Sequence, residues 1–389
     1  MKKKKVQKVK KGGVMDKKEF VPYQAKIKAI GVGGGGCNAI TRMVRKQIQG
    51  VDFIAVNTDA QDLMKSEAPT KIQIGEKLTK GLGVGGDPEL GRKSAEESRE
   101  ELAKIIAGTD LLFITAGMGG GTGTGAAPVI AELGKEAKAL TIAIVTKPFS
   151  FEGSVRRQKA EDGLLNLVEK VDTLIVIPND RLLNICNYKV TVDNAFSMAD
   201  EVLRNGVQAI SDLITVPGLI NLDFADVKTV MANAGQAWMA IGYGKGANRA
   251  VEAAKAAIAS PLLDVSIDGA KGVLLNFTGG GSLTLSEINE AAEIISKAAD
   301  PKANIIFGVT HDPNMDDEIR VTLIAAGFAG GKRVGLAKEE EMRRLLKDLK
   351  EEDRLDIPAF TRYSLPPRER QAVASSSEAE TQPSEVKEL

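Results

Sequence analysis

The sequence predicts an α/β protein in which a Rossmann-type parallel sheet comes first, a long central helix follows, and a smaller α+β domain ends the folded part. Three observations support this prediction. Short apolar runs alternate with helical stretches along the first half of the chain, as expected for parallel strands joined by helices. Glycine clusters directly follow two of these runs. Ala195–Ile214 has apolar residues at three-and-four spacing, which is typical of one long helix.

The first half of the chain contains the predicted parallel sheet. Its strands are expected at Ile27–Ile30, Phe53–Val56, Leu111–Thr115, Thr141–Thr146 and Thr173–Ile177, and helices at Asn38–Gln47 and Ala126–Leu133. Ligands of such sheets bind beyond the carboxyl ends of the strands, so the segments that follow the strands are expected to form one pocket. These segments are Gly31–Asn38, Asn57–Asp59, Gly117–Gly125 and Pro178–Asp180.

The second half is predicted to contain the α+β domain. Pro217 and Gly218 are expected to end the long helix. Further helices are predicted near Val227–Trp238, Ala247–Ile258 and Leu285–Ala299, and strands at Gly272–Thr278, Asn304–Thr310 and Ile319–Ala326.

Composition and these elements together predict seven segments. Residues 1–25 are expected to be a basic disordered arm, since the first eighteen residues contain nine lysines and one acid. The others are a nucleotide-binding domain (26–195), the central helix (196–216), the α+β domain (217–331), a charged linker (332–354), a short apolar peptide (355–362) and a disordered tail (363–389) rich in Pro, Ser, Glu and Gln.

The composition excludes several classes of protein. A formal net charge of zero argues against a nucleic-acid binder, although the lysine arm leaves contact with an anionic surface open. No run of about eighteen apolar residues is present, so no membrane insertion is expected, and no secretory signal follows the arm. Two cysteines, Cys37 and Cys186, indicate a reducing compartment, which favours the cytoplasm. The single histidine, His311, argues against a His-based triad or a zinc site.

The most informative motif is Gly117–Gly125, which contains six glycines and two threonines in nine residues. It lies between a predicted strand and a predicted helix, where inward-turned backbone N–H groups and the helix N-terminus bind phosphate. No lysine follows, so the motif is not the common P-loop. A structural turn needs one or two glycines rather than six, so this cluster favours a phosphate site.

A second glycine cluster, Gly31–Asn38, follows the first predicted strand. Gly31, Gly33 and Gly36 satisfy the dinucleotide pattern G-x-G-x-x-G, and Asp59 could bind a ribose hydroxyl as in a Rossmann protein. That interpretation leaves Gly117–Gly125 unexplained, and two phosphate loops suit one triphosphate better than one pyrophosphate. Cys37 stands where a helix N-terminus acidifies a thiol, but a small residue in a tight loop is the favoured interpretation.

Three further sets of charged residues have both a structural and a functional interpretation. Asp223 and Asp226 could orient a water or a cation, but their spacing alone favours a helix N-cap with a favourable charge in the first turn. Glu152 and Arg156 could hold a ribose or phosphate, or form a surface ion pair. Asp200 could accept from the N1–H and N2–H₂ groups of guanine, or be an ordinary polar helix residue.

Taken in this order, the motifs resemble those of the FtsZ family, the tubulin-like bacterial cell-division GTPases, over roughly Ile27–Ala329. Gly117–Gly125 resembles the glycine motif of the tubulin family. Other matching motifs are Gly31–Asn38, Asn57–Asp59, Thr146–Phe149, Ile177–Asp180 and Asn221–Asp226. Asp356, Ile357, Pro358, Ala359 and Phe360 are similar to the C-terminal peptide of the family, which docks membrane tethers and division regulators.

The resemblance implies a tubulin-like GTPase domain that binds GTP and GDP. In this domain glycines and threonines hold the phosphates, Glu152 and Arg156 lie near the ribose, and Asp200 recognises guanine. Mg²⁺ is implied as the ion that neutralises the phosphates, with a monovalent cation as a further aid, and no metal ligand is assigned. The implied nucleotide-binding residues are Gly34, Gly35, Gly36, Cys37, Asn38, Asp59, Gly121, Thr122, Gly123, Thr124, Glu152, Arg156, Asn179 and Asp200.

The resemblance also changes the interpretation of the carboxylates. In the family, the loop that matches Asn221, Asp223 and Asp226 enters the pocket of the next subunit, where the carboxylates polarise the attacking water. This implies a catalytic role for the three residues and a head-to-tail homopolymer that forms the septal ring at mid-cell. Two alternatives stay open: a filament that holds nucleotide without turnover, and a dinucleotide-dependent oxidoreductase.

Overall fold

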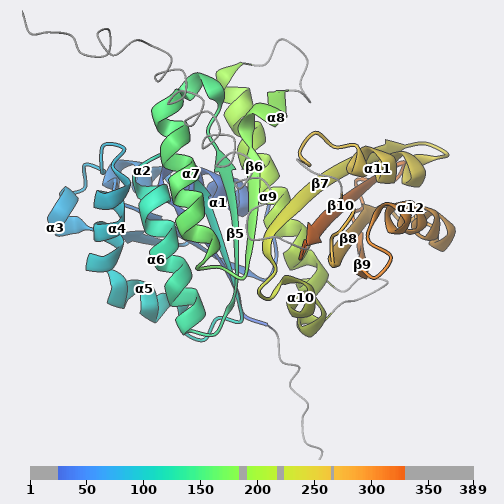
Figure 1. Cartoon of the computed structure of the whole chain (residues 1–389), viewed down its shortest axis with the longest axis horizontal. Coiled ribbons are helices and arrows are strands. Elements are labelled where there is room, and N and C mark those ends of the chain that lie inside the picture. Colours follow the sequence, from blue (N-terminus) through green and yellow to red (C-terminus); the bar gives the residue numbers. More distant parts are fainter. Residues whose placement is uncertain (1–24, 184–190, 217–222, 264–266, 329–389) are drawn as a thin grey trace, which may run out of the picture. The chain divides into compact units, whose positions relative to one another are not determined.

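The computed structural model of the chain describes residues 25–183, 191–216, 223–263 and 267–328 (Figure 1). Several predictions concern residues outside these ranges and stay predictions. They are the lysine arm, Cys186, the helix end at Pro217 and Gly218, Asn221, the charged linker, the peptide Asp356–Phe360 and the tail.

The described residues form one ten-stranded sheet with the strand order β3-β2-β1-β4-β5-β6-β7-β10-β8-β9. The first seven strands in this order are mutually parallel, and β10 is antiparallel to both of its neighbours. The predicted parallel sheet is therefore confirmed. The strands are β1 Ile27–Val32, β2 Val51–Asn57, β3 Thr70–Gln73, β4 Leu111–Gly117, β5 Leu140–Lys147, β6 Thr173–Pro178, β7 Gly235–Lys245, β8 Gly272–Gly279, β9 Asn304–His311 and β10 Glu318–Ala326.

Helices connect the parallel strands and cover the sheet, as expected for crossover connections. They are α1 Gly33–Arg45, α2 Ala60–Lys65, α3 Glu76–Thr79, α4 Pro88–Glu97, α5 Arg99–Ile106, α6 Thr122–Glu136, α7 Ser154–Val168, α8 Asn179–Leu183, α9 Val192–Thr215, α10 Phe224–Met231, α11 Arg249–Ile258 and α12 Leu285–Ala298, with a 3-10 turn at Ser150–Glu152.

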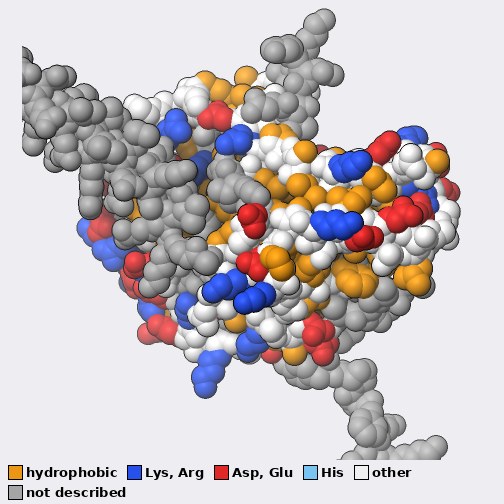
Figure 2. All heavy atoms as spheres, turned by 45° about the vertical axis from the view of Figure 1, so that its right-hand side comes forward, with side chains coloured by type: hydrophobic (Ala, Val, Ile, Leu, Met, Phe, Trp, Pro, Cys, Tyr) orange, Lys and Arg blue, Asp and Glu red, His pale blue; other side chains and the backbone are white. Residues whose placement is uncertain are grey.

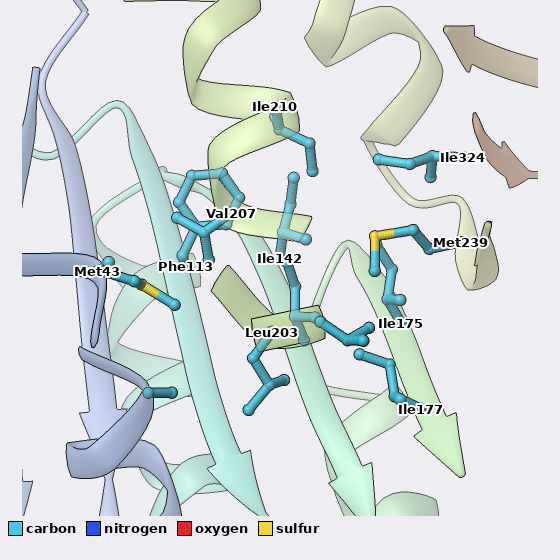
Figure 3. Close-up of a cluster of buried hydrophobic side chains, with 14 of the residues drawn as sticks. Met43, Phe113, Ile142, Ile175, Ile177, Leu203, Val207, Ile210, Met239 and Ile324 are labelled. Carbon is cyan, nitrogen blue, oxygen red and sulfur yellow. The ribbon is translucent and has the colours of Figure 1, made fainter. Parts of the chain in front are cut away.

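Three hydrophobic clusters hold these layers together. On one face of the parallel strands, Met43 of α1 and Leu203 and Val207 of α9 pack against Phe113 and Ile142 (Figure 3). The opposite face is covered by α5, α6 and α7. The third cluster lies between α11, α12 and the strands β7 to β10. Helix α9 belongs to the first cluster together with α10, so the long helix packs against elements from both halves of the chain.

The two glycine clusters are partly helical, which corrects the predicted helix starts. Helix α1 begins at Gly33 rather than Asn38, and α6 begins at Thr122 rather than Ala126. Glycine has a low helix propensity, so neither start was visible from the sequence. Close packing explains the outcome, because a Cβ atom on Gly36 would lie 2.3 Å from the carbonyl oxygen of Thr115. The glycines therefore let each helix begin directly against the sheet.

The prediction of one helix over Val227–Trp238 is wrong. Helix α10 ends at Met231, and Trp238 lies in β7, opposite Ala325 of β10. Asn233 and Gly235 have positive φ angles of 51° and 69°, which break the helix between the two elements. The small apolar residues around Trp238 fit the period of a helix as well as that of a strand. Pairing with β6 and β10 makes this segment a strand.

The surface has no basic face on the side where β7 to β10, α11 and α12 come forward. Figure 2 shows Lys and Arg side chains there interspersed with Asp and Glu. Among the helices of the described ranges, none is long and apolar enough to cross a membrane.

Candidate functional site

A cavity of about 610 Å³ lies where the parallel strands end at their carboxyl edge. The segments after β1, β2, β4, β5 and β6 all contribute to its wall, together with one side of α9. This volume falls in the range of small-molecule sites, and the position is the one expected for a ligand of a parallel sheet.

The N-termini of α1 and α6 meet at this cavity. Gly34 and Gly35 line it from α1, and Thr122 and Gly123 line it from α6. Neither helix has a side-chain cap at its first turn, so the free backbone N–H groups are available to an anion. Gly33 joins the two ends: its φ is +70°, and a Cβ atom there would lie 2.9 Å from the backbone nitrogen of Gly123. Two converging helix N-termini are suited to several phosphates.

A third glycine-rich segment, Gly81–Gly86, also lines the cavity and was missed by the sequence analysis. Leu82, Gly83, Val84, Gly85 and Gly86 all contribute to the wall. The four glycines of the segment, at 81, 83, 85 and 86, have positive φ angles between 56° and 80°. Their close spacing in the sequence was the available signal. The Nζ atom of Lys159 in α7 donates to the carbonyl of Gly86 at 2.5 Å and so connects this loop to α7.

Asp59 and its neighbours hold the loop after β2 against α6. The Oδ1 atom of Asp59 accepts from the backbone N–H groups of Gln61 at 2.9 Å and Asp62 at 3.1 Å, and so caps α2. The hydroxyl oxygens of Thr58 and Thr122 lie 2.7 Å apart. Both Asp59 and Asp62 line the cavity, and Asp62 was not singled out from the sequence.

The remaining part of the wall carries polar side chains that suit a ribose and a base. Glu152 accepts from the backbone N–H of Phe149 at 2.8 Å and binds Arg156 at 2.5 Å, so the predicted ion pair and the predicted cavity position are both present. Asn38, Asn179 and Asp200 also line the cavity. The buried Oδ1 atom of Asn179 has no hydrogen-bond partner among the described residues, as expected for an atom that meets a ligand.

Asp200 lies on the cavity side of α9 beside Phe196. The Oδ2 atom of Asp200 accepts from the Nε atom of Arg42 in α1 at 2.9 Å. Burial raises the pKa of the Asp200 carboxyl, and the hydrogen bond and positive charge of Arg42 oppose that rise. A carboxylate in this position is able to accept two donors from a purine edge.

Three residues implied as nucleotide contacts lie behind the cavity wall. Gly36 packs against the backbone of Thr115, and the Oγ1 atom of Thr124 accepts from the backbone N–H of Gly119 at 2.9 Å. The Cys37 side chain is buried, and burial raises the pKa of its thiol to about 12. The idea of an acidified thiol is therefore wrong, because loss of solvation outweighs the helix N-terminus. These three residues support the loops from behind the cavity wall.

Asp223 and Asp226 lie at the opposite edge of the sheet. They form a capping box on α10: the Asp226 N–H donates to Asp223 Oδ1 at 2.8 Å, and the Asp223 N–H donates to Asp226 Oδ2 at 3.2 Å. The same helix is bonded to the start of β6, since the Thr173 hydroxyl donates to the carbonyl of Met231 at 2.5 Å. Asn179 of the cavity directly follows the other end of β6.

The described residues contain no group of three or more His, Cys, Asp and Glu side chains arranged to hold a metal ion.

The fold and the cavity together define a tubulin-like nucleotide-binding protein. The profile of the Tubulin/FtsZ family GTPase domain matches residues 26–187, and the profile of the FtsZ family C-terminal domain matches residues 235–329. The chain belongs to the FtsZ family and is a GTPase. The resemblance inferred from the motifs is thus confirmed, and neither the oxidoreductase nor the filament without turnover is supported.

Solved structures agree with this assignment. An empty FtsZ dimer from M. jannaschii is 49% identical, with a TM-score of 0.76, over 78% of this chain and 89% of that chain. CetZ1 from Haloferax volcanii, a GDP-bound monomer, is 22% identical with a TM-score of 0.70, over 84% of this chain and 99% of that chain. CetZ2 from the same organism, a GTPγS-bound protofilament, is 20% identical with a TM-score of 0.68 over the same shares. The two CetZ proteins share the fold.

Proposed function

We propose that this GTPase assembles head to tail, and that Asp223 and Asp226 of one subunit act on the nucleotide in the cavity of the next. The observation that carries this proposal is the separation of the two sites. The cavity follows the carboxyl end of β6, whereas α10 is bonded to its amino end. Six residues of β-strand span about 20 Å, so these carboxylates are out of reach of the cavity of their own subunit.

The carboxylates that line the cavity at its phosphate end, Asp59 and Asp62, already accept hydrogen bonds from their own loop. The donors at this end are backbone N–H groups and hydroxyls, with no histidine or lysine on the wall. A second copy that stacks the α10 edge of its sheet on the cavity would bring two exposed carboxylates to that end. These would orient and polarise the attacking water, with Asn221 as a further member of the same loop. Such a contact is heterologous and repeats without closing, so it produces filaments.

Exposed apolar side chains near the cavity support a protein partner there. Leu82, Phe151 and Val155 are 81%, 61% and 68% exposed. Phe151 stacks on Phe149 with ring centroids 5.0 Å apart and approaches Phe196 of the cavity wall at 6.4 Å. Large apolar side chains that gather around a polar cavity are typical of an interaction surface. A second copy that covers them would also exclude water from the reacting nucleotide.

The residues present fit a guanine nucleotide with Mg²⁺. Gly34, Gly35, Gly121, Thr122 and Gly123 would hold the phosphates, and Asn38, Glu152, Arg156, Asn179 and Asp200 would hold the ribose and base. Asp59 and Asp62 offer carboxylate oxygens beside the phosphate end, where bound Mg²⁺ would neutralise phosphate charge. A role for a monovalent cation belongs to the same proposal, without an assigned ligand.

We extend the proposal to the role of the filament in the cell. The FtsZ of M. jannaschii has been solved as a dimer and CetZ2 of Haloferax volcanii as a protofilament, so those two proteins assemble. For this chain, we propose a cytoplasmic filament that forms the division ring at mid-cell. The peptide Asp356–Phe360 would recruit membrane tethers and division regulators through the linker of residues 332–354.

A mixing experiment tests the shared site. Asp226→Asn keeps an oxygen for the capping box but removes the charge, whereas Gly33→Val obstructs the cavity. Each variant alone should hydrolyse little GTP. A one-to-one mixture should recover about one quarter of the wild-type rate per subunit, because that share of random contacts joins an intact cavity to an intact loop. Full activity of Asp226→Asn alone would contradict the proposal.

Dilution of the unmodified protein gives a second, independent measurement. Phosphate release per subunit should rise steeply above a threshold protein concentration, with Mg²⁺ and K⁺ present. A rate per subunit that stays constant on dilution would mean that each chain is a complete enzyme.

A further inference from the structure

Arg42 of α1 makes two hydrogen bonds to α9, directly behind the polar wall of the cavity. Its Nε atom donates to Asp200 Oδ2 at 2.9 Å, and its Nη2 atom donates to Ser197 Oγ at 2.8 Å. Since the guanidinium group is planar, two bonds from different nitrogens determine its orientation. The Asp200 carboxylate is therefore held from the side that faces away from the cavity.

Arg42 itself does not line the nucleotide cavity among the described residues. The Asp200 side chain is 13% exposed and belongs to the cavity wall, whereas Arg42 is 41% exposed and lines a second cavity of about 570 Å³ on the far side. Arg42 thus acts on the nucleotide only through Asp200.

The bond occupies one oxygen of Asp200. Its other oxygen, and the second lone pair of Oδ2, remain for donors from the cavity. Guanine presents two adjacent donors, N1–H and N2–H₂, and both require an ionised carboxylate, since a protonated one would place an O–H group against them. Recognition therefore depends on both the charge and the orientation of this group.

Several charged groups surround Asp200 in the described part of the chain, and Arg42 is the one that forms an ion pair with it. Across the first cavity stand Asp59, Asp62 and the ion pair of Glu152 with Arg156. On the far side, Arg45 pairs with Glu67 and Arg204 pairs with Glu201, while Lys46 lines the second cavity. Burial of Asp200 favours its neutral form, and Arg42 opposes this effect.

We infer that Arg42 is a positioning residue for base selectivity: it holds the Asp200 carboxylate ionised and oriented for the two guanine donors. This inference rests on the proposed role of Asp200 in guanine binding. It predicts that loss of Arg42 weakens GTP more than a nucleotide that lacks the 2-amino group, and that it makes GTP binding sensitive to acid.

The test compares the affinities for GTP and inosine triphosphate, which lacks the 2-amino group, between about pH 5.5 and pH 8.5. Arg42→Gln should bind GTP about tenfold more weakly near neutral pH, and its preference for GTP over inosine triphosphate should shrink. The loss should deepen as the pH falls, because without Arg42 neither its hydrogen bond nor its charge opposes the rise that burial causes in the pKa of the Asp200 carboxyl. Arg42→Lys should keep the pH profile of the unmodified protein, since the charge remains, but recover only part of the selectivity.

Arg45→Gln is the matched control. Arg45 lies one turn further along α1, lines the same second cavity and pairs with Glu67 rather than Asp200. This variant should retain the affinity, the selectivity and the pH profile of the unmodified protein. A similar loss in Arg45→Gln would overturn the inference, because the effect would then come from general positive charge.

Asp200→Asn tests the proposed role of Asp200 separately from the role inferred for Arg42. If Asp200→Asn retains the full preference for GTP, the proposed role of Asp200 is wrong. If Asp200→Asn loses that preference while Arg42→Gln and Arg42→Lys both keep it with an unchanged pH profile, only the inference about Arg42 is overturned. Thermal unfolding of each variant establishes that it is folded at the temperature of the binding measurement.

Discussion

Two regions of the molecule use different chemical groups. The first region runs from the start of the sheet to the end of α9, and the second region follows α9. The first, which carries the cavity, presents backbone N–H groups of glycine-rich helix starts and of the loop Gly81–Gly86. The second, from Asp223 to Phe328, relies on charged side chains, in its exposed capping box and in a buried ion pair. Among the standard residues, proline alone removes a backbone N–H donor, whereas a charged side chain is removed by many substitutions. The first region should therefore be sensitive to added atoms, and the second to removed charges.

The largest expected effect is on turnover, from the second region. Asp226→Asn should reduce GTP hydrolysis by a factor of about 10² or more, because a group that acts on the attacking water is lost. GTP affinity should stay unchanged, as the cavity belongs to the first region. Phosphate release and nucleotide titration measure the two quantities. Thr284→Ala, which removes the capping box of α12, is the control and should leave turnover intact.

The next effect is on stability and concerns the buried Arg249. Its guanidinium donates to both oxygens of Glu287, at 2.7 and 3.2 Å, and to the carbonyl of Asp316 at 2.8 Å. Arg249→Met should lower the free energy of unfolding by about 2–3 kcal/mol, because Glu287 loses its partner. Denaturant unfolding checks this value. Unchanged stability would mean that the charges of this region contribute nothing to its folding.

The same pair predicts a pH dependence. Arg249 lowers the pKa of Glu287 to about 2 from an ordinary value of 4.5. The folded state therefore prefers the ionised carboxylate, so the pair stabilises the protein above about pH 4.5 and loses this contribution as the pH falls toward 2. The acid-induced loss should be smaller in Arg249→Met.

A substitution that adds a single carbon atom tests whether the first region is sensitive to added atoms. Gly33→Ala should weaken GTP binding about tenfold, because its φ of +70° is strained for alanine and its Cβ would lie 2.9 Å from Gly123 N. Gly279→Ala in β8 is the matched control, since its Cβ would meet only ordinary contacts at 3.4 Å or more. Equal nucleotide affinities for the two variants would show that the first region is not especially sensitive to added atoms.

The smallest expected effect concerns Asp212, which lies near the C-terminal end of α9. Burial raises the pKa of this carboxyl from 3.8 to about 6, although Gln208, Arg320 and Arg204 oppose the rise. The folded state holds the proton more tightly than the unfolded state, so stability falls as the pH rises from about 4 to 6. Asp212→Asn should therefore be about 1–2 kcal/mol more stable at pH 7 and no different below pH 4. Thermal unfolding across this range measures the difference.

Much of the fold was predictable because buried parallel strands are continuous apolar runs, which need no tertiary information to recognise. Leu111–Thr115 and Thr141–Thr146 are such runs, and both lie in strands of the sheet. Trp238 was assigned to a helix because its neighbours are small and fit either period. Its strand depends on β6 and β10, which are distant in the sequence. Thr70–Gln73 was missed for a different reason, because it is four residues long and contains one apolar residue, Ile72.

The sequence by itself determined the class of protein and the chemistry of its cavity. Glycine clusters directly after strands indicate a phosphate site, and the order of these motifs along the chain identifies the family. Only the tertiary structure decided which residues form the wall. It turned Cys37 and Thr124 away from the cavity, brought in Gly81–Gly86, and placed Arg42 behind Asp200. The reason is physical: a strand or glycine turn is a local property of the chain, whereas the direction of a side chain depends on the element that packs against it.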